Sequence, residues 1–289
     1  MSGSTQTIQS IAIIGAGIVG LSCAVELADR GLRVAVFDKT WPPRGASWAA
    51  AGMLAPAFEA ASMPGTHPKL FELCDRSAQL WPIWSAALED RTGLSAGYQA
   101  GPSLAGAIDP AQALNLAEIE RAMRGHRHAP ARCAVDVSSI DPAISDMVRT
   151  ALLLPSDGQV DNRRTLTALV ACIEAHPNIV IHPNEAPLQT RGRQIDHAGY
   201  DATLVGAGWR TAKVRAEEYD RSLTLAALDP ALDTIRSYGG QMLSVAPIEG
   251  APQLTIRCGD LYIVPKQDRI VIGATTEPER VLQTAEADV

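Results

Sequence analysis

The sequence has no excess of positive charge and no long apolar run. Its formal net charge is −7 at pH 7, so it has no general attraction for phosphate backbones, and we expect no nucleic-acid partner. The apolar runs are too short to span a bilayer. Residues 1–9 are polar and lack the basic and apolar regions of a signal peptide. We therefore expect a cytoplasmic protein without a membrane partner.

Paired cysteine and histidine motifs are also absent. The five cysteines are scattered, odd in number and never in C-x-x-C spacing, which favours reduced thiols. The six histidines form no H-x-x-x-H or H-E-x-x-H pair, so we expect no metal. What the chain does have is size and apolar content. Its 289 residues, 46% of them hydrophobic, can bury a substantial core in two domains or lobes.

The most informative segment begins with the short apolar run Ile11–Ile14, which is typical of a strand buried on both faces of a parallel sheet. The pattern Gly-x-Gly-x-x-Gly follows directly, at Gly15, Gly17 and Gly20. The first glycine permits a tight turn, the second lets backbone approach a pyrophosphate, and the third allows close packing of helix on strand. Residues 18–30 have helical apolar spacing, so the phosphates would meet a helix N-terminus.

A second strand is predicted over residues 33–37, and it ends at Asp38. This acid follows the glycines by about 20 residues, where a carboxylate can accept hydrogen bonds from a ribose. The strand, the glycines, the helix, the second strand and the acid follow one another in the order that is typical of a dinucleotide-binding motif. The pattern therefore predicts a dinucleotide-binding site, with FAD as the favoured ligand.

The next segment, residues 44–56, combines Gly and Ala with the hydroxyl of Ser47, which suits backbone packed around a large flat ligand. A close-packed loop without a ligand would look the same in isolation. Placed after Asp38, however, the segment resembles the flavin loop of the D-amino-acid-oxidase-like family, especially the glycine oxidases of thiamine biosynthesis. The resemblance is strong up to about residue 60 and recurs in two later patches.

The first later patch begins at residues 158–164, which resemble the return of the family's chain into its FAD domain. Asn162 replaces the proline that is usual there. An amphipathic helix over residues 165–175 and a strand over residues 178–182 are expected to follow.

The same patch continues with two further cofactor contacts that the resemblance implies. The turn at residues 186–188 brings the backbone of related proteins to the adenine, which implies a role for Pro187. Residues 206–209, Gly-Ala-Gly-Trp, come just after a predicted strand over residues 200–205. They resemble the family's second glycine-containing contact with the cofactor.

The second later patch comprises residues 239–245, 260–265 and 269–275, which alternate in polarity and are rich in β-formers. We expect them to form antiparallel strands of a sheet that covers the substrate. In the family, the tyrosine that matches Tyr262 lines the substrate pocket. The alternative is that Tyr262 is an ordinary strand aromatic.

The expected fold class is α/β: a Rossmann-like FAD-binding domain of the glutathione-reductase type, interleaved with an α+β substrate domain built on an antiparallel sheet. The FAD domain is expected at residues 1–100 and 156–215, and the substrate domain at residues 101–155 and 216–289. Long helices are expected over residues 69–91 and 110–125.

The resemblance implies catalytic roles for Tyr262 and Met53. It also implies that FAD is bound by residues of the glycine-containing turns, the acid and the flavin loop. These are Gly15, Gly17, Ile18, Val19, Gly20, Asp38, Lys39, Ala46, Ser47, Ala51, Gly52, Met53, Pro187, Ala207, Gly208 and Trp209.

The implied reaction is the FAD-dependent oxidative deamination of glycine or another small amino acid or amine. The products would be the 2-oxo acid, ammonia and hydrogen peroxide, with oxygen as acceptor and a link to thiamine biosynthesis. The protein must hold the α C–H of the substrate against flavin N5. The resemblance also allows a homo-oligomer.

Three alternatives stay open. An amino-acid dehydrogenase would pass electrons to an acceptor other than oxygen, and an inactive remnant would bind flavin without turnover. An NAD-dependent dehydrogenase is less favoured, because residues 44–56 have no obvious nicotinamide role.

The sequence departs from the family in one important respect. The Gly-x-Arg-Pro motif, whose arginine pairs with the substrate carboxylate in related oxidases, occurs nowhere in it. We expect either that the family's C-terminal segment is missing or that another arginine replaces this one, with Arg257 and Arg236 as local candidates. Asp260 would repel a substrate carboxylate if it pointed inward, and Thr276 stands where some relatives have methionine.

Overall fold

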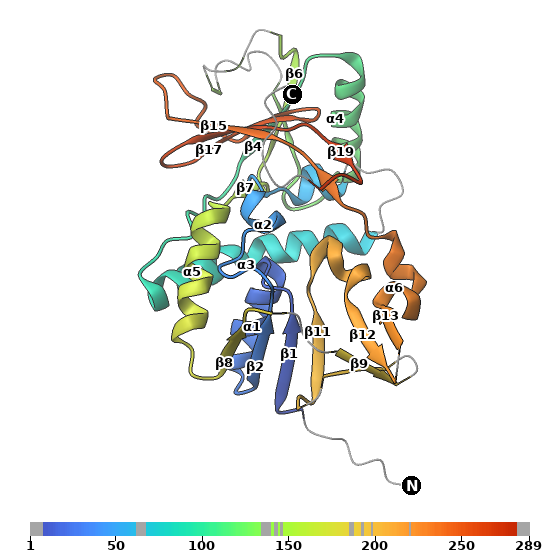
Figure 1. Ribbon diagram of the computed structural model, residues 1–289. Helices are drawn as coiled ribbons and strands as arrows, with labels where there is room; N and C mark the ends of the chain where they lie inside the picture. Colours follow the sequence, from blue (N-terminus) through green and yellow to red (C-terminus); the bar gives the residue numbers. More distant parts are fainter. Residues whose placement is uncertain are drawn as a thin grey trace. The chain divides into compact units, whose positions relative to one another are not determined.

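The computed structural model describes residues 8–61, 68–133, 140–141, 144, 147–184, 188–191, 194–197, 199–219 and 221–281. The chain forms two compact units (Figure 1). The first unit comprises Met1–Ala49 and Leu166–Ser237, and the second comprises Ala50–Thr165 and Tyr238–Val289. Within the described part of the chain, no helix has the length and apolar character that crossing a membrane requires.

The first unit contains a four-stranded parallel sheet in the order β11-β1-β2-β8 (Figure 1). Its strands are β1 (Ser10–Ile14), β2 (Arg33–Phe37), β8 (Ile179–His182) and β11 (Ala202–Val205). Strand β1 is buried along its whole length, as a continuous β-branched run requires inside a parallel sheet. The four strands predicted for this part of the chain are confirmed.

Helix α1 (Ile18–Asp29) connects β1 to β2 and confirms the helix predicted over residues 18–30. It buries one face, because its apolar residues recur at intervals of three and four positions. The buried apolar side chains are Leu21, Ala24, Val25 and Ala28. Helix α5 (Asn162–Ala175) begins before the predicted residue 165, since Asp161 accepts hydrogen bonds from the backbone N–H groups of Arg163 and Arg164.

A second, smaller sheet of the first unit has the order β10-β9-β12-β13. Its elements and the short helices near them are β9 (Leu188–Arg191), β10 (Gln194–His197), β12 (Arg215–Glu218), β13 (Arg221–Thr224), η3 (Gly208–Lys213), α6 (Leu225–Leu228) and η4 (Pro230–Thr234). A buried cluster joins side chains of both sheets, among them Ile14, Phe37 and Leu188, with Leu225 of α6. The two sheets of this unit therefore share one core.

The second unit is built on a seven-stranded sheet in the order β15-β18-β17-β16-β4-β6-β5. The strands are β4 (Ser103–Ala107), β5 (Ala131–Cys133), β6 (Thr150–Leu154), β15 (Met242–Val245), β16 (Ile256–Cys258), β17 (Leu261–Pro265) and β18 (Ile270–Gly273). Its pairs are antiparallel except that of β16 with β4. The antiparallel strands predicted from residues 239–245, 260–265 and 269–275 are confirmed by β15, β17 and β18.

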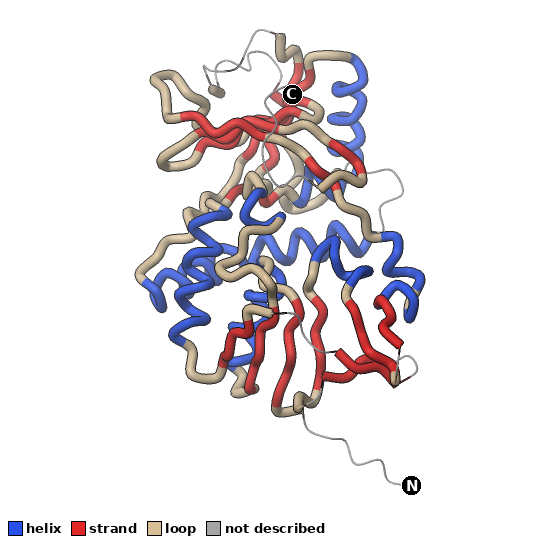
Figure 2. Tube along the Cα trace, in the orientation of Figure 1, coloured by secondary structure: helices blue, strands red, loops and turns tan. Residues whose placement is uncertain are grey.

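A helix lies beside this sheet, as the blue and red segments in the upper part of Figure 2 show. It is α4 (Pro110–Ala122), which packs on β4 and β6; the π-helical turn η1 (Pro56–Ala61) packs on α4 and on helix α3 (Pro68–Thr92). Phe58 of η1 and Leu116 and Ile119 of α4 pack in one core with Ala105 of β4 and Leu152 of β6. The predicted helix over residues 69–91 is confirmed, whereas the one predicted over 110–125 ends at Ala122.

The compact units differ in their bounds from the domains expected from the sequence. The difference arises because β3 (Met53–Leu54) pairs antiparallel with β7 (Gly158–Gln159). This pairing places residues 50–56 and residues 156–165 in one unit. Residues 216–237 belong to the first unit, where β12 and β13 pair. Two further strands, β14 (Tyr238–Gly239) and β19 (Glu277–Pro278), form a small ladder of their own.

Asp157 holds the start of η1 in place. Its fully buried carboxyl group accepts hydrogen bonds from the backbone N–H groups of Ala57 and Phe58, at 2.8 and 3.0 Å. Burial nevertheless dominates and raises the pKa of Asp157 to about 6, from an ordinary 3.8. The folded chain therefore keeps a proton on this group over a range of pH in which the unfolded chain has lost it.

This difference makes stability fall as pH rises from about 4 to 6, because the unfolded state binds fewer protons in that range. We expect the free energy of unfolding of the wild type, relative to Asp157→Asn, to fall by about 2 kcal/mol between pH 4 and pH 6. Urea unfolding at pH 4, 5 and 6 measures the difference. A difference that is independent of pH would contradict the raised pKa.

Candidate functional site

The turn from β1 to α1 lies against the end of β11. Gly15 has φ +105°, and a Cβ atom there would lie 2.6 Å from the carbonyl oxygen of Gly206. A Cβ atom on Gly20 would lie 1.9 Å from the carbonyl oxygen of Gly15. Gly206 also donates its N–H to the carbonyl of Ile14, at 2.8 Å. The two glycine-containing segments predicted separately from the sequence are therefore neighbours, and no larger side chain fits at Gly15 or Gly20.

The N-terminus of α1 is suited to an anion. Its N-cap is Gly17, which has no side chain to accept a hydrogen bond, and no acidic residue lies in its first turn. Ile18 donates its N–H to Oγ of Ser47, at 3.0 Å, and Val19 is exposed. Backbone N–H groups and the positive end of the helix dipole together favour a phosphate at such an end.

Asp38 lies at the same edge of the sheet, at the end of β2. One of its carboxylate oxygens accepts the N–H of Ala16 at 2.8 Å, and the other accepts the N–H of Thr40 at 2.9 Å. A carboxylate has about four lone-pair positions, so Asp38 can also accept a ribose hydroxyl. The donor and acceptor set at this edge thus fits a dinucleotide.

The other predicted cofactor residues of the first unit are less informative. Lys39 and Ala46 are exposed, while Ser47 and Ala207 are half-buried. Gly208 and Trp209 begin the 3-10 helix η3. The indole of Trp209 faces the cations of Arg210 and Lys213, at 4.9 and 5.0 Å from the ring centre. Pro187 lies outside the described residues.

Two glycine variants, one inside the turn and one outside it, test how closely the backbone packs at this turn. We expect Gly20→Ala to destabilise the chain by about 1–3 kcal/mol, because the new methyl group must displace backbone. Gly45 has nothing within 4 Å of its Cβ position, so Gly45→Ala should change stability by less than about 0.5 kcal/mol. Urea unfolding measures both variants. Equal stability of the two would show that the turn is not as tight as described.

In the second unit, residues 51–53 are fixed to the segment that follows β7. Gly52 has φ +80°, and a Cβ atom there would lie 2.2 Å from the carbonyl oxygen of Val160. Val160 donates its N–H to the carbonyl of Gly52, at 2.8 Å. Ala51 is buried, and Met53 pairs with Gln159. The predicted residues Ala51, Gly52 and Met53 therefore have a backbone that is set by residues 159–160.

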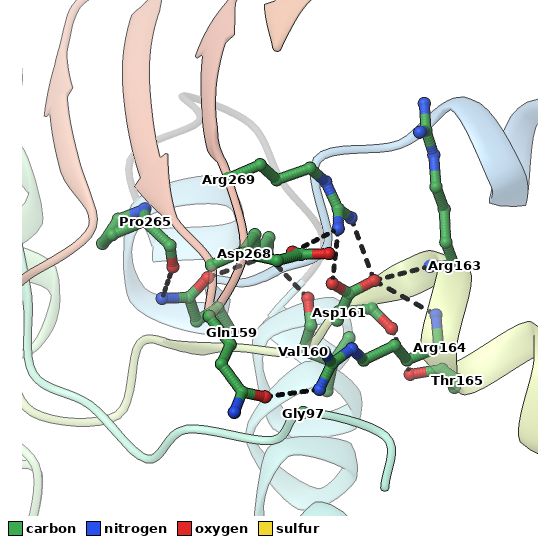
Figure 3. Close-up of polar contacts among 12 residues, drawn as sticks. Gly97, Gln159, Val160, Asp161, Arg163, Arg164, Thr165, Pro265, Asp268 and Arg269 are labelled. Atoms are coloured by element: carbon green, nitrogen blue, oxygen red, sulfur yellow. Dashed lines mark hydrogen bonds and ion pairs between the residues drawn. The ribbon is translucent and has the colours of Figure 1, made fainter. Parts of the chain in front are cut away.

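This segment is in turn held by the turn between β17 and β18 (Figure 3). Lys266 donates from Nζ to Oε1 of Gln159 at 2.8 Å and to the carbonyl of Val160 at 2.6 Å. Burial lowers the pKa of Lys266 to about 8. The sequence interpretation missed Lys266, although a lysine at the end of an apolar strand was a usable signal.

Figure 3 also shows Arg269 paired with Asp161. The guanidinium contacts both carboxylate oxygens, at 3.0 and 2.9 Å. Burial acts to raise the pKa of Asp161, but the hydrogen bonds from Arg269 and from the N–H of Arg164 outweigh it and leave the pKa below its usual range. Asp161 thus stays ionised at neutral pH and connects the start of α5 to the β17–β18 turn.

Arg269 forms two ion pairs, a buried one with Asp161 and an exposed one with Asp268. The side chain of Asp161 is 3% exposed and that of Asp268 is 56% exposed. We expect Asp161→Asn to cost about 3 kcal/mol, because it leaves Arg269 without its buried partner. Asp268→Asn should cost less than about 0.5 kcal/mol. Thermal or urea unfolding measures the loss of stability in both variants. Equal losses would contradict the role given to Asp161.

The two predicted catalytic residues meet in one apolar cluster of the second unit. Met53, Met242 and Tyr262 pack against the buried side chains Ala51, Val264 and Val271. The ring of Tyr262 lies over Gly273, where a Cβ atom would be 2.8 Å from its Cζ and Oη atoms. The hydroxyl of Tyr262 donates to Sδ of Met242, at 2.8 Å. Burial raises the pKa of Tyr262, so its hydroxyl stays protonated at neutral pH.

The arginine candidates differ in their surroundings. Arg257 is buried in β16 of the second unit, whereas Arg236 belongs to the first unit, is exposed and contacts Asp233. Asp260 is exposed at the start of β17. Among the described residues, no group of three or more His, Cys, Asp and Glu residues is arranged to hold a metal ion.

Comparison with known proteins identifies the family. Residues 10–289 match the family model described as FAD dependent oxidoreductase. The chain belongs to this family. FAD is the cofactor of these oxidoreductases, so the expected cofactor and the expected α/β fold with a parallel sheet are both confirmed.

Two curated relatives and one crystal structure place the chain within the FAD-dependent oxidoreductases. The bifunctional protein ThiO/ThiG of Trichormus variabilis is 32% identical over 279 residues, which are 93% of this chain and 40% of that protein. A glycine oxidase of Geobacillus kaustophilus is 28% identical over 280 residues, which are 93% of this chain and 70% of that enzyme. The crystal structure of glycine oxidase from Geobacillus kaustophilus matches with a TM-score of 0.77 at 25% identity, over 96% of this chain and 74% of that chain. The chain therefore spans less than half the length of the bifunctional relative.

Proposed function

We propose that the chain oxidises glycine or another small amino acid to the 2-oxo acid and ammonia. The observation that supports this proposal most is the similarity to proteins named glycine oxidase, which extends over 93% of the chain. Bound FAD would supply the hydride acceptor for the α-carbon of the substrate. Oxygen is the proposed final acceptor, with hydrogen peroxide as product. The similarity to ThiO/ThiG proteins supports a place in thiamine biosynthesis.

In this proposal, residues of the first unit bind the adenosine and pyrophosphate of FAD. The N-terminus of α1, with Gly15, Gly17, Ile18, Val19 and Gly20, receives the pyrophosphate, because its N–H groups and dipole attract anions. Asp38 accepts a ribose hydroxyl, as its free lone pairs allow. The remaining proposed contacts of this part of the chain are Lys39, Ala46, Ser47, Pro187, Ala207, Gly208 and Trp209.

Residues of the second unit are proposed to receive the flavin ring and the substrate. Ala51, Gly52 and Met53 offer a backbone without bulky side chains at the first two positions, held in place by Val160 and Lys266. Tyr262 offers a protonated hydroxyl, which would exchange its hydrogen bond to Sδ of Met242 for one to the substrate, and its ring would exclude water together with Met53 and Met242. The units would thus serve as FAD domain and substrate domain, while the cytoplasmic location and oligomeric state stay predictions from the sequence.

Anaerobic reduction tests the proposal. The purified chain is mixed with FAD, freed of excess cofactor, and given glycine without oxygen, with acetate as a control that has no amine. We expect glycine to bleach the visible flavin bands and acetate to leave them unchanged. Admission of air should restore the bands and consume oxygen.

The other outcomes separate the alternatives. Bleaching by glycine without oxygen uptake would replace the oxidase by an amino-acid dehydrogenase. Flavin bands that no small amino acid bleaches would leave a flavin-binding chain without this activity. Absence of bound FAD would overturn the proposal for this chain.

A further inference from the structure

One row of residues crosses the sheet of the second unit from β15 to β6. Residues that lie directly opposite each other in neighbouring strands point to the same face of a sheet. The register of the strands gives the row Met242, Gly273, Tyr262, Arg257, Ala105 and Leu152. The row ends in β5 at Arg132, opposite Leu152. Between β15 and β6, Arg257 is the one charged residue, and it is the direct neighbour of Tyr262.

Along this row, Arg257 lies between fully buried residues on one side and half-buried residues on the other. On one side, Ala105 and Leu152 are fully buried beneath η1 and α4. On the other side, Tyr262 and Met242 are half-buried. The guanidinium carbon of Arg257 lies 3.8 Å from the ring centre of Phe58, which fixes the plane of the cation by a cation–π contact.

The hydrogen bonding of Arg257 is incomplete. Nη1 pairs with Oε1 of Glu59, but among the described residues Nε has no hydrogen-bond partner although it is buried. A buried N–H without an acceptor costs free energy, so an acceptor from outside the chain would be favoured there. The guanidinium presents its N–H groups in a planar fork, which matches a carboxylate.

Glu59 is the more exposed member of this pair. Its side chain is 50% exposed, whereas that of Arg257 is 10% exposed. Glu59 can therefore turn toward solvent without the loss of buried contacts, whereas Arg257 cannot. The other nearby carboxyl group, Asp157, is already bonded to Ala57 and Phe58.

We propose that Arg257 binds the carboxylate of the substrate and that Glu59 is an internal counter-ion with which this carboxylate competes. The proposal rests on the proposed function, which supplies an amino-acid substrate and hence a carboxylate. It places the carboxylate anchor beside Tyr262 in the same row of the sheet. It also predicts that removing the charge of Arg257 weakens carboxylate binding, whereas removing the charge of Glu59 strengthens it.

The test uses the FAD-loaded protein and acetate, a carboxylate that cannot be oxidised as an amine. The dissociation constant of acetate is measured from the broadening of its methyl proton NMR signal. We expect Arg257→Gln to weaken acetate binding by about tenfold to a hundredfold, as loss of a charge-assisted hydrogen bond does. Arg257→Lys should fall between Arg257→Gln and wild type, because it keeps the charge and loses the fork. Glu59→Gln should strengthen binding several-fold, because the competing charge is gone.

A surface pair in the same unit gives the control. Arg121 and Glu118 form an exposed ion pair on α4, so Arg121→Gln and Glu118→Gln should leave acetate binding unchanged. If Arg257 and Glu59 only stabilise the fold, their variants shift acetate binding in the same direction or not at all. That result, or a wild type that does not bind acetate, would overturn the proposal. If Arg257→Gln does not fold, Glu59→Gln still decides, because weaker or unchanged binding contradicts the competition.

Steady-state kinetics distinguish failure of the carboxylate site at Arg257 from failure of the proposed amino-acid oxidation. With glycine, Arg257→Gln should raise KM far more than it lowers kcat, and with glycinamide, which has no carboxylate, it should leave KM nearly unchanged. Acetate binding that follows the expected pattern in a chain that oxidises no amine would retain Arg257 as a carboxylate site and reject the oxidase. Glycine oxidation with an unchanged KM in Arg257→Gln would retain the oxidase and reject Arg257.

Discussion

The close approach of three backbone segments at Gly15, Gly20 and Gly206 is the constraint on which the first unit depends. A Cβ atom at Gly15 or Gly20 would fall within 2.6 Å of a carbonyl oxygen, so these positions admit no side chain. The approach brings the N-terminus of α1 to the edge of the sheet where β1, β2 and β11 end. Asp38 and Ser47 then contact the same turn through Ala16 and Ile18. An anion-binding helix end and a ribose-binding acid are thereby placed at one edge.

The second unit depends on a comparable connection, made by charge. Asp161 accepts hydrogen bonds from the first N–H groups of α5 and from Arg269, and Lys266 binds the carbonyl just before it. Because Val160 is bonded to Gly52, this cluster fixes the backbone that leads to Met53. Strand β17, which ends at Pro265 just before Lys266, also contains Tyr262. The two residues proposed to face the substrate thus have their backbone set by one network.

Much of this arrangement could be predicted from local sequence. The strand at Ile11–Ile14, the glycines and the helix after them depend on short-range pattern, and the structure has them at the expected residues. The contact of Gly15 with Gly206 and the pairing of Arg269 with Asp161 join residues far apart in the chain. The pattern of a single sequence does not show which distant residues come into contact. The roles of Lys266 and Asp157, and the pairing of Glu59 with Arg257, were therefore missed.

We propose that the first unit binds the adenosine and pyrophosphate of FAD. The most direct measurement is a fluorescence titration of the chain with FAD and, separately, with FMN, which lacks the adenosine and the second phosphate. We expect FMN to bind at least about a hundredfold more weakly than FAD, a difference of about 3 kcal/mol. Equal affinities would contradict it, because recognition would then depend on the flavin ring and not on the turn at Gly15–Gly20.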